Sequence, residues 1–181
     1  MMKIPALSLL APAIVALAAS MPAQATITVF TTTLNGANEV PVNASAASGS
    51  AQVSFDDAAS SVLVSVTFSG LTAAASAGHI HCCTATAFTS TAGVALGFPG
   101  FPNATSGTYN ASPTVYSGGN TFASVLAGAF AGKAYVNIHD SSFPGGEIRG
   151  FLVPVPEAST YAMLLAGLGL VGVCVRRRRA A

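Results

Sequence analysis

The sequence predicts an all-β fold, a single domain built as an antiparallel β-sandwich of Greek-key type. Three observations predict it. Alternation of apolar and polar residues with a period of two runs through the middle of the chain, where helical periodicity is weak. Clusters of Gly, Pro, Asn and Ser separate these runs, as turns separate strands. About 130 residues lie between two apolar ends, which is enough for one hydrophobic core.

The elements follow from this pattern. In the clearest strand, 61–69, valines and Phe68 alternate with Ser and Thr. Similar runs predict strands at Thr26–Leu34, Ser50–Asp56, Gly78–Cys82, Lys133–His139 and Glu147–Val153. Thr121–Ala131 is the one plausible helix of the domain. The Gly- and Pro-rich segment Phe98–Ser112 predicts a long surface loop.

Residues 1–25 have the pattern of a secretory signal peptide, which we expect to be helical. A basic start is followed by the apolar stretch Ile4–Ala19 and by the small residues Ala23 and Ala25 around Gln24. We expect cleavage after Ala25. A retained N-terminal membrane anchor is the alternative.

Residues 154–181 have the pattern of a sorting tail. Pro156 and Glu157 precede the apolar stretch Tyr161–Val175, which with the residues back to Pro156 approaches the ~20 residues of a membrane span. Basic residues after an apolar segment remain on the cytoplasmic side. The sequence therefore predicts a C-terminal transmembrane helix that anchors the protein transiently and ends in Arg176, Arg177, Arg178 and Arg179.

Charge argues against nucleic acid as a partner. Between the two ends, at 26–153, five carboxylates stand against Lys133 and Arg149, which leaves a net charge of −3. The value of +1 for the whole chain comes from the arginine cluster of the tail. The domain thus has no basic surface for nucleic acid, and its polar surface is Ser, Thr, Asn and Gly.

The three histidines suggest a metal site. His79 and His81 lie two apart on a predicted strand and so point to one face. His139 lies at the end of another strand. Imidazole ligands suit copper or zinc, and protonation should then release the metal below about pH 6. The alternative is that the histidines only form hydrogen bonds within a polar face.

A predicted hairpin adds neighbours to this site. If the loop Asp140–Gly146 is symmetric, Tyr135 pairs with Phe151, Asn137 with Arg149 and His139 with Glu147. Asn137, Arg149 and Glu147 would then surround the histidines on one face, and Glu147 could accept a hydrogen bond from an imidazole. We expect His139 within about 12 Å of the other two histidines, since neighbouring strands lie ~4.8 Å apart.

Cys82 and Cys83 follow His81 directly. In an oxidising compartment they could form a vicinal disulfide, pair between chains or remain buried thiols. A thiolate beside the histidines would favour copper or zinc. The sequence has no Gly-x-Ser-x-Gly nucleophile motif, and it has too few histidines for the two-metal site of a superoxide dismutase. A non-enzymatic protein is therefore expected.

Four motifs carry a family resemblance. They are LNGANEVP at 34–41, GHIH at 78–81, YVNIH at 135–139 and PGGEIRG at 144–150. In this order they resemble the CHRD domain, here at 26–153. The tail resembles the PEP-CTERM sorting signal, with Ala158 in place of the usual second proline.

The two resemblances imply a location and partners. The CHRD resemblance implies a β-sandwich in an extracellular or envelope protein without established catalytic activity. The tail implies secretion across the inner membrane and processing by an exosortase. We expect a protein of the cell surface or extracellular matrix that acts in adhesion or associates with exopolysaccharide or other surface proteins. An envelope protein that binds copper or zinc is the alternative.

Overall fold

The computed structural model describes residues 26–156 and 158–179. The predicted signal peptide, with Ala23 and Ala25, and Glu157 of the tail lie outside the described residues. The described strands form one antiparallel sheet in the order β6-β3-β2-β1-β9-β8-β4-β5-β7, and β10 pairs with β1. The strands are β1 (Ile27–Asn35), β2 (Ser48–Asp56), β3 (Ser61–Ser69), β4 (Ala75–His81), β5 (Val94–Gly97), β6 (Gly107–Ala111), β7 (Val115–Tyr116), β8 (Tyr135–Asp140), β9 (Ile148–Phe151) and β10 (Val153–Pro154). The helices are η1 (Gly36–Asn38), α1 (Phe122–Phe130) and α2 (Ala158–Arg179).

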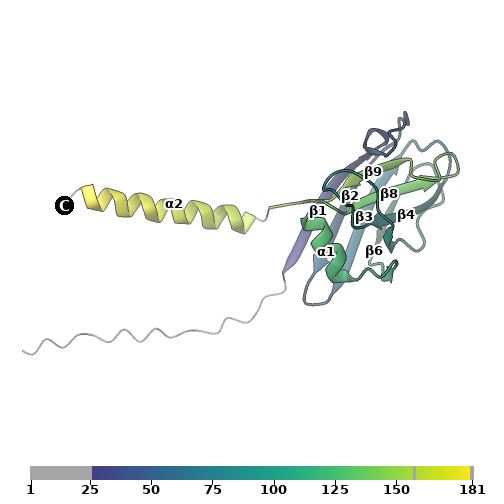
Figure 1. The fold of residues 1–181 in the computed structure, drawn as a ribbon. Helices are drawn as coiled ribbons and strands as arrows, with labels where there is room; N and C mark the ends of the chain where they lie inside the picture. Colours follow the sequence, from purple (N-terminus) through teal and green to yellow (C-terminus); the bar gives the residue numbers. More distant parts are fainter. Residues whose placement is uncertain (1–25, 157, 180–181) are drawn as a thin grey trace, which may run out of the picture.

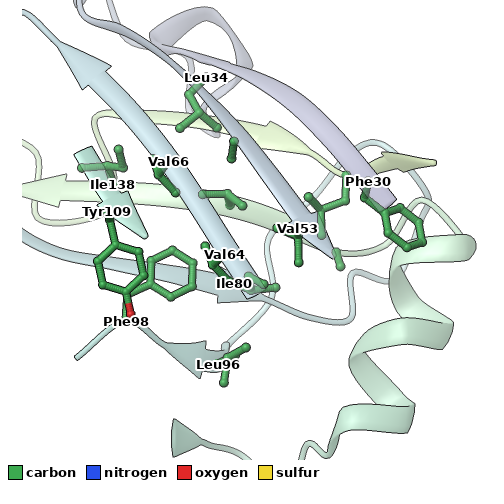
Figure 2. Packing of buried hydrophobic residues seen from close by; sticks show 14 of the residues in the cluster. Phe30, Leu34, Val53, Val64, Val66, Ile80, Leu96, Phe98, Tyr109 and Ile138 are labelled. Carbon is green, nitrogen blue, oxygen red and sulfur yellow. The ribbon is translucent and has the colours of Figure 1, made fainter. Parts of the chain in front are cut away.

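The sheet curls into a half-barrel around the core (Figure 1). One half, β6-β3-β2-β1, contributes Val53, Val64 and Val66, and the other half contributes Ile80 and Ile138. Figure 2 shows these side chains meeting between the two halves. Alternation along each strand sends the apolar residues inward, as the sequence predicts.

The predicted sandwich of two separate sheets is not confirmed, because β1 joins the halves. Along one edge β1 pairs with β2 through its whole length. Along the other edge it pairs with β9 at Asn35–Arg149 and with β10 at Phe30 and Thr31. The hydrogen-bonded ladder is therefore continuous from β6 to β7.

Helix α1 covers one end of the core. Its predicted bounds are confirmed to within a residue, because Thr121 caps the helix and forms a capping box with Ser124. Phe122 packs edge-on against Phe55 of β2, and Phe130 packs edge-on against Phe30 of β1.

The segment 98–112 is only partly a loop, and the prediction was wrong at its end. Residues 107–111 form β6, which pairs with β3 from Phe68 to Val64. Tyr109 points into the core and stacks on Phe98 with ring centroids 5.2 Å apart, while Thr108 and Asn110 face out. The alternation was present in the sequence, but neighbouring Gly and Pro residues obscured it.

Helix α2 follows β10 in Figure 1. No helix within the described part of the chain combines the length and apolarity needed to cross a membrane. The predicted transmembrane helix is therefore not confirmed.

Candidate metal centre

The three histidines come together on one face of the β4–β8 pair. His79 and His81 alternate on β4 with the core residue Ile80, and His139 lies on β8 beyond the core residue Ile138. One nitrogen from each imidazole lies within 4.8 Å of the others. The prediction that His139 lies within about 12 Å of both other histidines is confirmed.

Two backbone carbonyls fix the orientation of two of these rings. Nδ1 of His81 lies 2.9 Å from the Ala92 oxygen, and Nδ1 of His139 lies 3.1 Å from the Pro144 oxygen. Since a carbonyl only accepts, each Nδ1 carries the proton, and each neutral ring presents Nε2 as a bare lone pair.

These two Nε2 atoms face one another at 3.4 Å. Neither has a proton to give while both rings are neutral and Nδ1-protonated, so the contact is repulsive. A cation between the two nitrogens would reverse the sign of this interaction. Histidine ligands of metals are held in the same way, with the other ring nitrogen donating to a carbonyl.

His79 completes the group. Its ring centroid lies 5.1 Å from that of His139 and 5.7 Å from that of His81. Its Nδ1 is buried and has no hydrogen-bond partner among the described residues. A buried polar atom without a partner is costly, and coordination of an ion by this ring would remove that cost or offset it.

The surroundings keep the histidines neutral. Burial, together with the nearby His139 and His81, lowers the pKa of His79 to about 4. Burial also lowers the pKa of His81 and of His139. The neutral imidazole is the form that binds metal, so the site holds its ligands ready well below neutral pH.

Tyr135 supports the site from β8. Its ring stacks on His81 with centroids 4.9 Å apart and planes 3° from parallel. Its hydroxyl oxygen accepts from the Ala92 N–H at 3.2 Å. Tyr135 thereby holds both His81 and the carbonyl that orients it, a role that the sequence pattern did not reveal.

The predicted hairpin register is confirmed for Tyr135 opposite Phe151 and Asn137 opposite Arg149, and the β8–β9 ladder ends at Ile138–Ile148, before the predicted pair of His139 with Glu147. Asn137 also lies opposite His79 on β4. Its Oδ1 is buried without a partner in the described part of the chain. Asn137 is therefore placed beside the histidines, as predicted.

Glu147 lies elsewhere. Its carboxylate accepts from the Thr72 N–H at 3.0 Å, from the Thr72 hydroxyl at 2.8 Å and from the Ser45 hydroxyl at 2.6 Å. It tethers the loops that follow η1 and β3. The carbonyls of Ala92 and Pro144 take the imidazole-orienting role that the sequence suggested for Glu147.

Arg149 is buried and contacts several separate segments of the chain. Its guanidinium donates to the carbonyls of Asn38 and Ser90 and lies 4.7 Å from the centre of the Tyr135 ring. Its Nε is 3.8 Å from a carboxylate oxygen of Glu39. Sequence reasoning missed this partner, since 110 positions separate the two residues.

Cys82 and Cys83 form a vicinal disulfide, the first of the three predicted alternatives. The pair lies against α1, where a Cβ added at Gly128 would collide with both sulfur atoms. Cys82 is buried and Cys83 is exposed. With their thiols joined to each other, the two residues are not part of the histidine group.

Comparisons with known proteins agree with the motifs. The family model described as the CHRD domain matches residues 30–152, and the model described as the PEP-CTERM protein-sorting motif matches residues 154–179. The first match includes the three histidines, Asn137, Glu147 and Arg149, and the second includes Pro156 and the arginine cluster. No curated protein and no solved structure matches the chain.

Proposed function

Because the chain belongs to the CHRD domain family and ends in a PEP-CTERM sorting motif, we propose that this exported, exosortase-sorted surface protein binds copper or zinc through His79, His81 and His139. The observation that carries the proposal is the pair of Nε2 lone pairs of His81 and His139 facing each other at 3.4 Å. Without a cation between them, the two lone pairs repel each other.

The ligand set favours these two metals. Three neutral imidazoles match the preference of copper and zinc for nitrogen, whereas calcium and magnesium prefer oxygen. His79 and His139 are only partly buried. A bound ion would therefore keep a coordination position open to water or to a ligand from outside. We assign the site to binding rather than catalysis, because no nucleophile or carboxylate of the described chain is found among the imidazoles.

The test is the metal content of the exported, processed protein. After equilibration with Cu²⁺ or Zn²⁺ and gel filtration, mass spectrometry of the metal should give about one ion per chain. His81→Ala and His139→Ala should each lose it. Asp57→Ala, which removes an exposed carboxylate from a turn, is the control and should keep it. Full metal content in both histidine variants would refute the proposal.

A second candidate, adhesion or association with exopolysaccharide, is favoured by a different surface. The outward residues of β1, β2, β3 and β6 lie in register and form two rows across four strands. The rows are Thr33, Ser50, Thr67 and Thr108, and Thr31, Gln52, Ser65 and Asn110. We name these eight residues the polar face. They line a shallow hollow of about 750 Å³.

The polar face suits a neutral, hydroxyl-rich partner. None of its side chains is charged, and none takes part in a hydrogen bond found within residues 26–156. All of their donors and acceptors are therefore free for an external partner. Retardation of the protein in a gel containing dextran tests this role, with Thr67→Lys as the disrupting variant and Asp57→Lys, away from the face, as its control. Equal migration of wild type with and without dextran would exclude it for neutral glucans.

A further inference from the structure

A second hollow lies beside β1, toward η1 and β9, and none of the three histidines lines it. It has a volume of about 450 Å³ and lies between β1, η1 and β9. Its lining includes Thr32, Thr33, Glu39, Phe88 and Phe151, and Arg149 forms its floor. We call it the Glu39 pocket. A volume of this size is typical of small-molecule sites.

Glu39, a lining residue of the pocket, carries an unsatisfied hydrogen-bond acceptor. Glu39 is 4% exposed, and its Oε1 has no partner among the described residues. Its other oxygen, Oε2, is the one that lies near Arg149. A buried carboxylate oxygen left without a donor is costly, so a ligand that donates a hydrogen bond to Oε1 gains affinity from relieving that cost.

The charges around the pocket select a neutral donor. Arg149 Nε and Glu39 Oε2 are 3.8 Å apart. Burial raises the pKa of Glu39 to about 7, and above that pH an anionic ligand at Oε1 would be repelled by the carboxylate. An ammonium at Oε1 would be attracted by the carboxylate, but it would be repelled by the adjacent guanidinium and would lose its hydration. A hydroxyl avoids both penalties.

The mouth of the pocket is apolar. Phe88 is 60% exposed, and its ring lies edge-on to Phe151 with centroids 5.9 Å apart. A ligand with a C–H face beside a hydroxyl edge matches an aromatic wall next to a carboxylate and two threonines. Sugar rings have this character.

The pocket is also continuous with the polar face. Thr32 and Thr33 line both the pocket and the hollow over the polar face. We propose that the Glu39 pocket binds one neutral sugar unit, with a ring hydroxyl donating to Glu39 Oε1 and the ring lying against Phe88. This inference rests on the second candidate function, and it places a specific subsite at the end of the broader face.

Saturation-transfer NMR on the exported, processed protein tests it. The probes are the methyl glycosides of glucose, galactose and mannose, with glucuronate and glucosamine as charged counterparts. At least one neutral glycoside should receive saturation, and both charged sugars should bind about fivefold more weakly or not at all. Phe88→Ala should weaken the neutral sugar about tenfold. Phe130→Ala, which removes a phenylalanine of similar exposure, 57%, from α1, should not.

Glu39→Gln gives an independent readout. It removes the negative charge that the carboxyl carries above about pH 7, so at pH 8 the affinity for glucuronate relative to that for the neutral sugar should be higher in the variant than in wild type. Absence of saturation on every neutral glycoside overturns the pocket, and so does wild-type binding by Phe88→Ala. If either result is obtained and dextran still retards the wild-type protein, the polar face binds polysaccharide but the Glu39 pocket is not a sugar subsite. If dextran does not retard the wild-type protein, the second candidate function itself is refuted for neutral glucans.

Discussion

The imidazoles of His81 and His139 show which part of a binding site a sequence can reveal. The period of two along a strand places His79 and His81 on one face, and the hairpin pattern brings His139 beside them. The carbonyls of Ala92 and Pro144, which orient two of the rings, belong to loop backbone. Their positions depend on loop conformation and leave no trace in residue type.

The structure lowers the pH at which the histidine site is expected to release its metal ion. Unperturbed imidazoles would be protonated below about pH 6 and release the ion. Burial lowers the pKa of His79 to about 4 and lowers those of His81 and His139. We expect zinc content, measured by equilibrium dialysis at fixed free Zn²⁺, to persist at pH 5.5 and to fall toward pH 4. Half-release at pH 6 or above would contradict this expectation.

Glu39 gives a second prediction about pH, because its pKa is shifted upward, whereas those of the histidines are shifted downward. Burial raises the pKa of this carboxyl from 4.5 to about 7, although Arg149 and the Val40 N–H act to lower it. The folded protein then binds a proton that the unfolded chain releases, so the stability contributed by Glu39 is complete below pH 4.5. It is lost as the pH rises through about 7.

Glu39→Gln removes this titration. The free energy of unfolding of the variant relative to wild type should therefore rise between pH 4.5 and pH 8, by at most about 3 kcal/mol. Urea denaturation of metal-free protein at the two pH values measures it. Asp57→Asn, an exposed carboxylate, should change stability by no more than about 0.5 kcal/mol at either pH. A Glu39→Gln difference that is constant with pH would show that this carboxyl does not titrate in that range.

Among the elements, helix α1 depends on a contact that its own sequence does not show. Gly128 lies mid-helix, where alanine usually stabilises by about 1 kcal/mol. Here an added methyl would meet the Cys82–Cys83 disulfide. Gly128→Ala should therefore lower the free energy of unfolding by about 1–3 kcal/mol, as measured by urea denaturation.

Two comparisons isolate the cause of that loss. Gly145→Ala adds a methyl where no atom lies within 4 Å, and it should be close to neutral. In a Cys82→Ala, Cys83→Ala background the sulfur atoms are absent, so Gly128→Ala should no longer destabilise. Equal destabilisation in both backgrounds would mean that the helix, and not the disulfide contact, sets the cost.

The elements best predicted from the sequence are those whose signal is local. Val62 to Phe68 alternate cleanly and form β3 as expected, and the β8–β9 register follows from burial of Val136 and Ile148. The short strands β5 and β7 were not predicted, because four and two residues are too few to establish a period.

For the whole molecule, local patterns predicted the all-β class but not how the sheet closes. A sandwich and a curled sheet have the same inward alternation. They differ in whether β1 bonds to β9 and β10, and this depends on pairing between residues more than 100 positions apart. The Glu39–Arg149 pair was hidden for the same reason.

Export predicts two cuts in the chain. The pattern of residues 1–25 places the first cut after Ala25, and the PEP-CTERM match at 154–179 indicates processing at the other end. Intact-mass measurement on protein from the native cell surface should give a start at Thr26 and loss of Arg176–Arg179. A mass that retains the arginine cluster would exclude processing, and Ala158→Pro, which restores the usual second proline, then tests whether Ala158 prevents it.

The pairing of β10 with β1 also determines how the domain bears mechanical load. The chain leaves the sheet through this two-residue strand and one further bond, from the Val155 N–H to the Val29 oxygen at 2.8 Å. If tension is applied through the tail, these few bonds are the first in its path, so we expect β10 to detach from β1 before the rest of the sheet opens. Leu152, which is fully buried and whose N–H donates to the Ala134 oxygen, is where we expect this detachment to stop. On this expectation the last residues of the domain would lengthen under tension while the sheet behind them stays folded.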